Sequence, residues 1–143
     1  MQAIRSFLIV LFMAVASTAV AQQTISISEL VNTKWRVENN RITDYDEYTL
    51  TEIIWKRKDG SFFKYPYYLT DTPVTSHDKS AFDYSKVGKT KKGSYIVSIN
   101  ERGGVVYCVS IESFDKKKGV FVTKVVTQGV TGAGGIDRFK LVK

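Results

Sequence analysis

Apolar and polar side chains alternate with the two-residue period of β-strands over most of this chain. After Thr33, short segments rich in Val, Ile, Thr, Tyr and Phe recur between Gly, Asp, Asn and Lys, a pattern typical of successive antiparallel strands. The first predicted strand runs from Thr33 to Asn40, and its Trp35 and Val37 share the face expected to point inward. The other predicted strands are Glu47 to Lys58, Ser61 to Thr70, Ala81 to Val87, Gly93 to Glu101, Val105 to Ser113, Val120 to Thr127 and Ile136 to Val142.

Most connections between these strands are short. Asp59-Gly60 favours a tight hairpin, because this pair readily adopts positive φ, and Arg102-Gly103-Gly104 predicts a second one. The segment from Asp71 to Lys92 is less regular and is expected to form a long flap. Before the first strand, Ser26 and Glu29 have the spacing of a capping box, which predicts a short helical turn over Thr24 to Val31. About eight strands in this order predict an all-β fold, an antiparallel up-and-down barrel.

The first residues have the pattern of a secretory signal peptide. Arg5 supplies the positive start, Phe7 to Ala16 is an unbroken apolar run, and Ala19-Val20-Ala21 has the small residues of a cleavage site. A membrane-spanning helix needs about 20 apolar residues, more than this run offers. Cleavage after Ala21 leaves residues 22–143 as a single domain of about 120 residues, secreted or periplasmic, with no transmembrane segment.

The chain is basic, with 21 Lys and Arg against 14 Asp and Glu. Much of the excess lies in turns, as in Lys116-Lys117-Lys118, where lysines serve solubility and protect sheet edges. An anionic partner such as a lipid headgroup or an acidic polysaccharide is the alternative reading of these turns. The export signal argues against a nucleic acid.

Nothing in the sequence marks a catalytic or metal centre. The single histidine, His77, and the single cysteine, Cys108, are too few for a zinc site, and Cys108 lies in an apolar strand where a buried thiol is expected. The acidic group Asp44, Asp46 and Glu47 lacks the ligand spacing of a calcium loop, which favours a solvated connection between strands. We therefore expect no enzyme activity, no metal and no cofactor; a hydrolase would need His77 beside a hydroxyl and a carboxylate in one cleft.

A short turn, a tryptophan early in the first strand and an arginine in the last strand give the chain a resemblance to the lipocalin-like (calycin) barrels. The Gly-x-Trp of that family corresponds here to Thr33-Lys34-Trp35, with threonine in place of glycine, and its closing arginine corresponds to Arg138. The resemblance implies that Arg138 stacks on Trp35 and binds the backbone of the turn before the first strand. It also implies a small exported ligand-binding domain.

Two functions remain open at this stage, and both follow from the aromatic and apolar strands. A hollow barrel would bind a small hydrophobic or amphipathic molecule, with Trp55 as an uncertain member of its lining, because the strand of Trp55 is apolar on both faces. A barrel filled by its own side chains would instead dock another exported protein or an envelope polymer through the face of Val106 and Cys108 or through its basic turns. The expected lumen residues are Phe63, Tyr65, Tyr67, Tyr95, Val97 and Tyr107.

Overall fold

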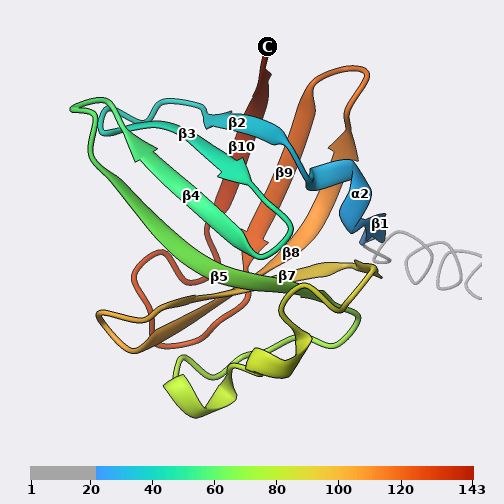
Figure 1. Cartoon of the computed structure of the whole chain (residues 1–143), viewed down its shortest axis with the longest axis vertical. Helices are drawn as coiled ribbons and strands as arrows, with labels where there is room; N and C mark the ends of the chain where they lie inside the picture. The colour runs from blue at the N-terminus through green and yellow to red at the C-terminus, as the bar shows by residue number, and fades with distance from the viewer. Residues whose placement is uncertain (1–21) are drawn as a thin grey trace, which may run out of the picture.

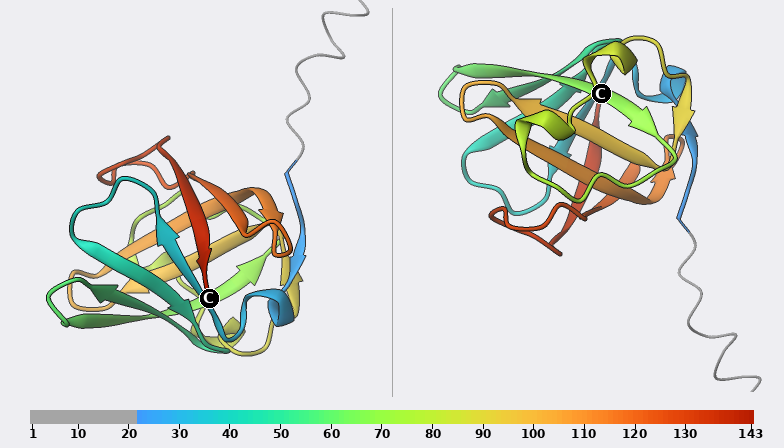
Figure 2. Two further views of the ribbon diagram at one scale, coloured as in Figure 1. Left: turned by 90° about the horizontal axis from the view of Figure 1, so that it is seen from above. Right: turned by 90° about the horizontal axis from the view of Figure 1, so that it is seen from below.

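The strands follow one another around a closed antiparallel ring, which Figures 1 and 2 show from three sides. The computed structural model describes residues 22–143, so the predicted leader, Met1 to Ala21, lies outside the described residues. Each strand pairs with the next one along the chain, and the last pairs with the first, which confirms the predicted all-β up-and-down barrel. The eight strands of the ring are β2 (Thr33–Val37), β3 (Thr43–Tyr48), β4 (Glu52–Arg57), β5 (Phe62–Thr70), β7 (Tyr95–Asn100), β8 (Val105–Asp115), β9 (Val120–Val125) and β10 (Ile136–Val142).

The two ends of this barrel differ. At one end, which we call the closed end, the short helix α2 (Ile27–Leu30) precedes β2, and its Ile27 and Leu30 are buried against the lumen side chains. The predicted capping box is present, since the Ser26 N–H donates to the Glu29 carboxylate at 3.0 Å. Two short strands pair at this end: β1 (Ile25–Ser26), directly before α2, and β6 (Lys92–Gly93), at the end of the flap. The opposite, open end carries the β2–β3, β4–β5, β7–β8 and β9–β10 connections.

Aromatic side chains fill the lumen near the closed end and form what we call the inner core. Trp35 is fully buried, as its alternation predicted, and its ring centroid lies 5.4 Å from that of Phe114 and 5.2 Å from that of Phe121. Its indole N–H donates to the Thr33 hydroxyl at 2.8 Å, so the polar edge of the ring is satisfied inside the core. The closed half of the barrel is therefore solid.

The predicted contact between Arg138 and Trp35 is wrong. Arg138 is exposed, and its neighbours Asp137 and Phe139 are the β10 residues that line the lumen. Leu141, not Arg138, is the β10 residue paired with Trp35. Side chains alternate across a strand, so the register that sends Phe139 and Leu141 inward sends Arg138 to solvent.

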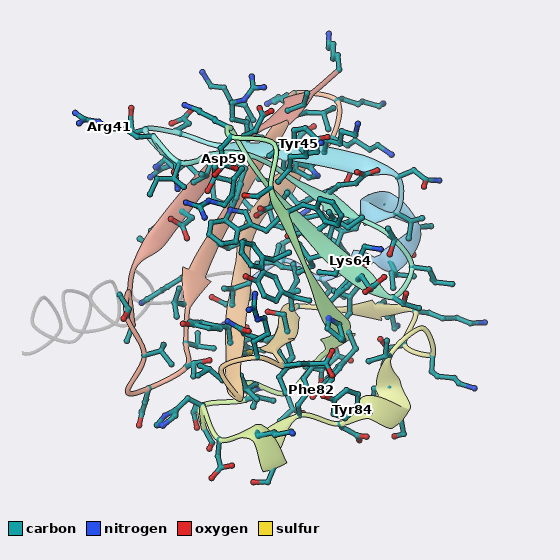
Figure 3. All side chains as sticks on the ribbon, turned by 60° about the vertical axis from the view of Figure 1, so that its left-hand side comes forward. Arg41, Tyr45, Asp59, Lys64, Phe82 and Tyr84 are labelled. Carbon is teal, nitrogen blue, oxygen red and sulfur yellow. The ribbon has the colours of Figure 1, made fainter. Side chains whose placement is uncertain are left out.

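The flap, residues 71–92, covers the outer face of β5, β7 and β8 and forms a second, outer core with them. The strand predicted for Ala81 to Val87 is wrong: two short 3-10 helices, η1 (Lys79–Ala81) and η2 (Tyr84–Lys86), occupy this segment (Figures 1 and 3). The carboxylates of Asp78 and Asp83 accept hydrogen bonds from the backbone two residues on, which turns the chain at both helices. The members of the outer core are Tyr68, Phe82, Tyr95, Val97, Ile99, Val106 and Cys108.

The outer core changes the reading of the face proposed above for docking. Val106 and Cys108 are fully buried, as expected for the thiol, and Phe82 of the flap packs against Tyr68 with ring centroids 5.1 Å apart. The main chain holds the flap in place, because the Val106 N–H donates to the His77 carbonyl at 3.0 Å. The apolar outer face of β8 is thus covered by the chain itself and is not available to a partner.

Candidate functional site

The open half of the barrel contains a cavity of about 550 Å³. Its volume is within the usual range of small-molecule sites. All eight strands of the ring contribute lining residues, and β5 and β9 give one each, Tyr65 and Thr123. The lining residues are Val37, Asn40, Thr43, Asp46, Tyr48, Ile53, Trp55, Tyr65, Ile96, Ser98, Asn100, Tyr107, Val109, Thr123, Asp137 and Phe139.

An aromatic wall on β4 and β5 forms one side of this cavity. The Trp55 ring stacks with two rings of β5. Its centroid lies 6.4 Å from that of Tyr65 and 5.5 Å from that of Phe63. The indole N–H of Trp55 donates to the Thr43 hydroxyl at 2.7 Å, which fixes the ring against β3. The guanidinium of Arg57 lies 5.7 Å from the centroid of the same indole. Held by these contacts, Trp55 presents a rigid apolar surface to the cavity.

A bulge in β3 decides which acidic side chain enters the cavity. The β3–β4 register shifts between Thr43 and Tyr45, so Asp44 is an extra residue on the outer side. On that side the Asp44 carboxylate forms an ion pair with Arg36 at 3.1 Å. Asp46 lines the cavity instead, and it is paired in the sheet with Trp35 of β2 and Trp55 of β4. The segment predicted to be a solvated connection is thus a barrel strand, and Asp46 faces inward.

The electrostatics of Asp46 are those of an unpaired acid in a confined space. Within residues 22–143 its carboxyl forms no ion pair and receives no hydrogen bond. Burial, and secondly the negative charge of Asp137, raise its pKa from 3.8 to about 7. At neutral pH this carboxyl is divided between its neutral and charged forms, so it can donate or accept a proton within a hydrogen bond or pair with a cation.

The six residues expected to line the lumen are divided among three places. Tyr65 and Tyr107 line the cavity, as expected, and Phe63 supports its wall through Trp55. Tyr67 points inward but lies deeper, in the inner core, where its hydroxyl donates to the Thr49 carbonyl at 2.6 Å. The remaining two, Tyr95 and Val97, do not face the lumen, contrary to the prediction.

Tyr95 and Val97 point away from the lumen, into the outer core. Their neighbours Ile96 and Ser98 are the β7 residues that line the cavity. The more apolar face of β7 lies under the flap and the face with the polar Ser98 and Asn100 lines the cavity, so the alternation alone indicates the wrong inner face.

Sequence reasoning missed Asp46 and Asp137 as cavity residues. For Asp137 a signal was present, because it precedes Phe139 and Leu141 at the two-residue spacing of one strand face. For Asp46 the corresponding signal is Tyr48, two residues on. The bulge conceals this signal. Thr43 faces the cavity, and strict alternation onward from Thr43 would turn Asp46 outward.

His77 is not in the cavity lining and has a structural contact instead. Its ring Nδ1 lies 3.0 Å from the Gln128 carbonyl, which ties the flap to the β9–β10 connection. In the described part of the chain, no three His, Cys, Asp or Glu side chains are placed to hold a metal ion together. None of the helices in that part is long and apolar enough to cross a membrane.

Comparison of the chain with protein-family models, with curated proteins and with solved structures gives no match. The barrel is compatible with a calycin-like fold on its strand number and order alone. Any statement about function therefore depends on the cavity.

Proposed function

We propose that this protein is an exported, non-catalytic, lipocalin-like barrel that binds one small amphipathic molecule in its open-end cavity. The observation that carries the proposal is the division of the barrel into a solid closed half and a hollow open half. An eight-stranded barrel is just wide enough to be filled by its own side chains or to hold one small ligand. Here the inner core ends below the level of Trp55 and Tyr107, and both side chains border empty space.

The chemistry of the lining favours an amphipathic ligand. Nine of the sixteen lining side chains are apolar or aromatic, and the other seven, among them Ser98 and Asn100, are polar. Sites of this composition hold the apolar body of a ligand by burial and orient it through one or two hydrogen bonds. At the open end Ile42, Phe62 and Ile136 are more than half exposed, which gives an apolar molecule a path to the cavity.

A fluorescent probe tests the proposal. N-phenylnaphthylamine is neutral near pH 7 and emits strongly only in an apolar site, so its emission should rise and saturate at one probe per protein. Replacing Ser98 with Phe fills part of the cavity and should weaken binding about tenfold, as overpacking of about 1–3 kcal/mol implies.

Lys64→Phe is the matched control. Lys64 is exposed on the outer face of β5 (Figure 3), so this substitution adds the same ring outside the barrel. Its probe affinity should stay within about twofold of the unaltered protein. Absence of saturable binding, or equal effects of Ser98→Phe and Lys64→Phe, would overturn the proposal.

The exported location rests on the leader sequence and has its own measurement. Native mass spectrometry of the protein purified from its own host should give the mass of a chain that begins at Gln22. A chain that retains Met1 to Ala21 would contradict export through a cleaved signal. The same spectrum reports the mass of any molecule that the cavity retains.

A further inference from the structure

We propose that the ligand is an amphipathic cation, whose ammonium group pairs with Asp46 while its apolar part lies against Trp55, Tyr65 and Tyr107. This inference rests on the proposed ligand-binding function and names the chemical class of the ligand. It begins from the charge of the cavity, which is opposite to that of the whole protein.

The cavity lining contains two acidic residues, Asp46 and Asp137, and no Lys, Arg or His. The chain as a whole has a formal net charge of +7. The charge of the lining is therefore opposite in sign to that of the chain as a whole. A lining of this charge attracts a cation and disfavours the carboxylate of a fatty acid.

Asp46 is also the one acidic side chain of β3 that is directed into the cavity without a partner. Asp44 on the same strand is bound to Arg36, and Glu38 at the end of β2 is bound to Lys140 at 3.4 Å. Withdrawing a carboxylate from water costs free energy unless a counter-charge compensates for it. No described residue supplies one to Asp46, so the ammonium group of a ligand would be its first ion-pair partner.

The groups that face Asp46 from the surrounding strands do not neutralise it. Asp137 on β10 adds a second negative charge, and the hydroxyls of Tyr48, Tyr65 and Tyr107 complete the titratable groups of the lining. Arg57 follows Trp55 by two positions on β4 but stacks over the indole and forms no ion pair with either aspartate. A cation entering the cavity would meet two carboxyls in the lining, with the Arg57 guanidinium already stacked over the Trp55 ring.

The aromatic wall suits the same ligand. The faces of Trp and Tyr rings carry negative potential and attract cations within about 6 Å, with Trp the most favourable. Trp55, Tyr65 and Tyr107 line the cavity that Asp46 also lines, and β3 places Asp46 directly opposite Trp55 in the register. One site thus offers a carboxylate for the charge and ring faces for the carbon atoms next to it.

The pH dependence follows from the protonation of Asp46. A cation binds the carboxylate form, and that form becomes dominant as the pH rises through about 7. The affinity for an ammonium ligand should therefore rise between about pH 6 and pH 8, while the affinity for a neutral ligand stays level. Asp137 changes neither expectation, because both carboxyls favour the cation when they are charged.

The test uses three ligands with one ring system and different charges: naphthylmethylamine, naphthylmethanol and naphthoate. Each is titrated against the unaltered protein loaded with N-phenylnaphthylamine, near pH 8. We expect the amine to displace the probe at a concentration at least about tenfold below that of the alcohol, as a charge-assisted hydrogen bond implies, and naphthoate to be the weakest.

Two variants then locate the effect. Asp46→Asn should weaken amine binding about tenfold or more and leave the alcohol within about twofold. Asp44→Asn removes the same charge from the outer side of the same strand and should keep the preference for the amine. Thermal melting confirms that both variants fold, and the pH dependence of the unaltered protein tests the inference without any substitution.

The outcomes separate this inference from the function on which it rests. If the probe does not bind, the ligand-binding function itself fails. If the probe binds but the alcohol or naphthoate displaces it as well as the amine, the function stands and the cationic ligand is overturned. An amine preference that survives Asp46→Asn would likewise overturn the assignment to Asp46.

Discussion

Asp46 and Asp137 line one cavity from β3 and β10, the two strands that flank β2, and neither is paired with a basic side chain of residues 22–143. Burial, and secondly the negative charge of Asp137, keep a proton on Asp46 up to about pH 7. Such a pair does not stabilise a folded chain. Groups retained at a cost to stability are typical of functional sites, which makes the cost itself measurable.

The first prediction concerns Asp46→Asn and stability. Because the pKa of Asp46 is raised from 3.8 to about 7 on folding, its contribution to stability is complete below about pH 4 and is lost as the pH rises to about 7. The asparagine variant has no such loss. Near pH 8 it should be more stable than the unaltered protein, by on the order of 1–4 kcal/mol, and near pH 4 the two should agree.

Urea unfolding of both proteins across this pH range measures the difference. Asp44→Asn serves as the control, since its carboxylate is half exposed in an ion pair with Arg36 and its loss should change stability by less than about 1 kcal/mol. An Asp46→Asn protein that is less stable than the unaltered one near pH 8 would show that the carboxylate has a partner in the folded chain.

A second prediction compares the stability contributions of Trp35, inside the barrel, and Arg138, on its outer face. Trp35→Ala removes a fully buried ring that contacts Phe114 and Phe121, and should cost about 3–5 kcal/mol in unfolding free energy. Arg138→Ala changes an exposed side chain and should cost less than about 0.5 kcal/mol. Chemical denaturation measures both, and losses of similar size would restore the arginine–tryptophan contact that the structure lacks.

A third prediction uses Cys108 to report on the flap. Burial raises the pKa of its thiol to about 11, and the flap residue Val74 directs its backbone N–H at the sulfur from 3.5 Å. The native protein should therefore react slowly with a disulfide reagent, and the denatured protein fully. Phe82→Ala removes the ring that packs the flap on Tyr68 and should accelerate labelling of the native protein at least about tenfold.

The same variant shows whether the two cores are independent. The outer core and the cavity lie on opposite faces of β7, with Tyr95 and Val97 on one side and Ile96 and Ser98 on the other. Phe82→Ala should therefore leave binding of N-phenylnaphthylamine unchanged within about twofold. Loss of probe binding together with faster labelling of Cys108 would place the flap in the ligand site.

Local patterns predicted the all-β fold and most of its strands, although the predicted strand Glu47 to Lys58 spans the turn between β3 and β4 and the strand predicted for Ala81 to Val87 is absent. The Asp59-Gly60 turn forms as expected, with Gly60 at a φ of 91°, and β10 occupies the predicted residues Ile136 to Val142. Both depend on signals within a few residues. Trp35 faces inward for the same reason, because a half-buried strand shows its inner face in its alternation.

The site depended on features that a local pattern does not carry. An acidic strand that turns Asp46 inward looks like a solvated loop, and the bulge beside Asp44 changes the phase without any glycine to mark it. On β7 the more apolar face lies under the flap and the face with Ser98 and Asn100 lines the cavity, so the two faces could be assigned correctly only with the tertiary structure. The position of Arg138 likewise follows from register.

The two tryptophans allow the most direct test of the hollow open half, since Trp35 lies in the solid core and Trp55 in the cavity wall. In nitrogen-labelled protein each indole N–H gives its own resonance, and a Trp55→Phe variant assigns the pair. On titration with N-phenylnaphthylamine, the Trp55 resonance should shift in proportion to occupancy while that of Trp35 stays nearly constant. A saturated probe signal with an unmoved Trp55 resonance would place the ligand elsewhere and contradict the account.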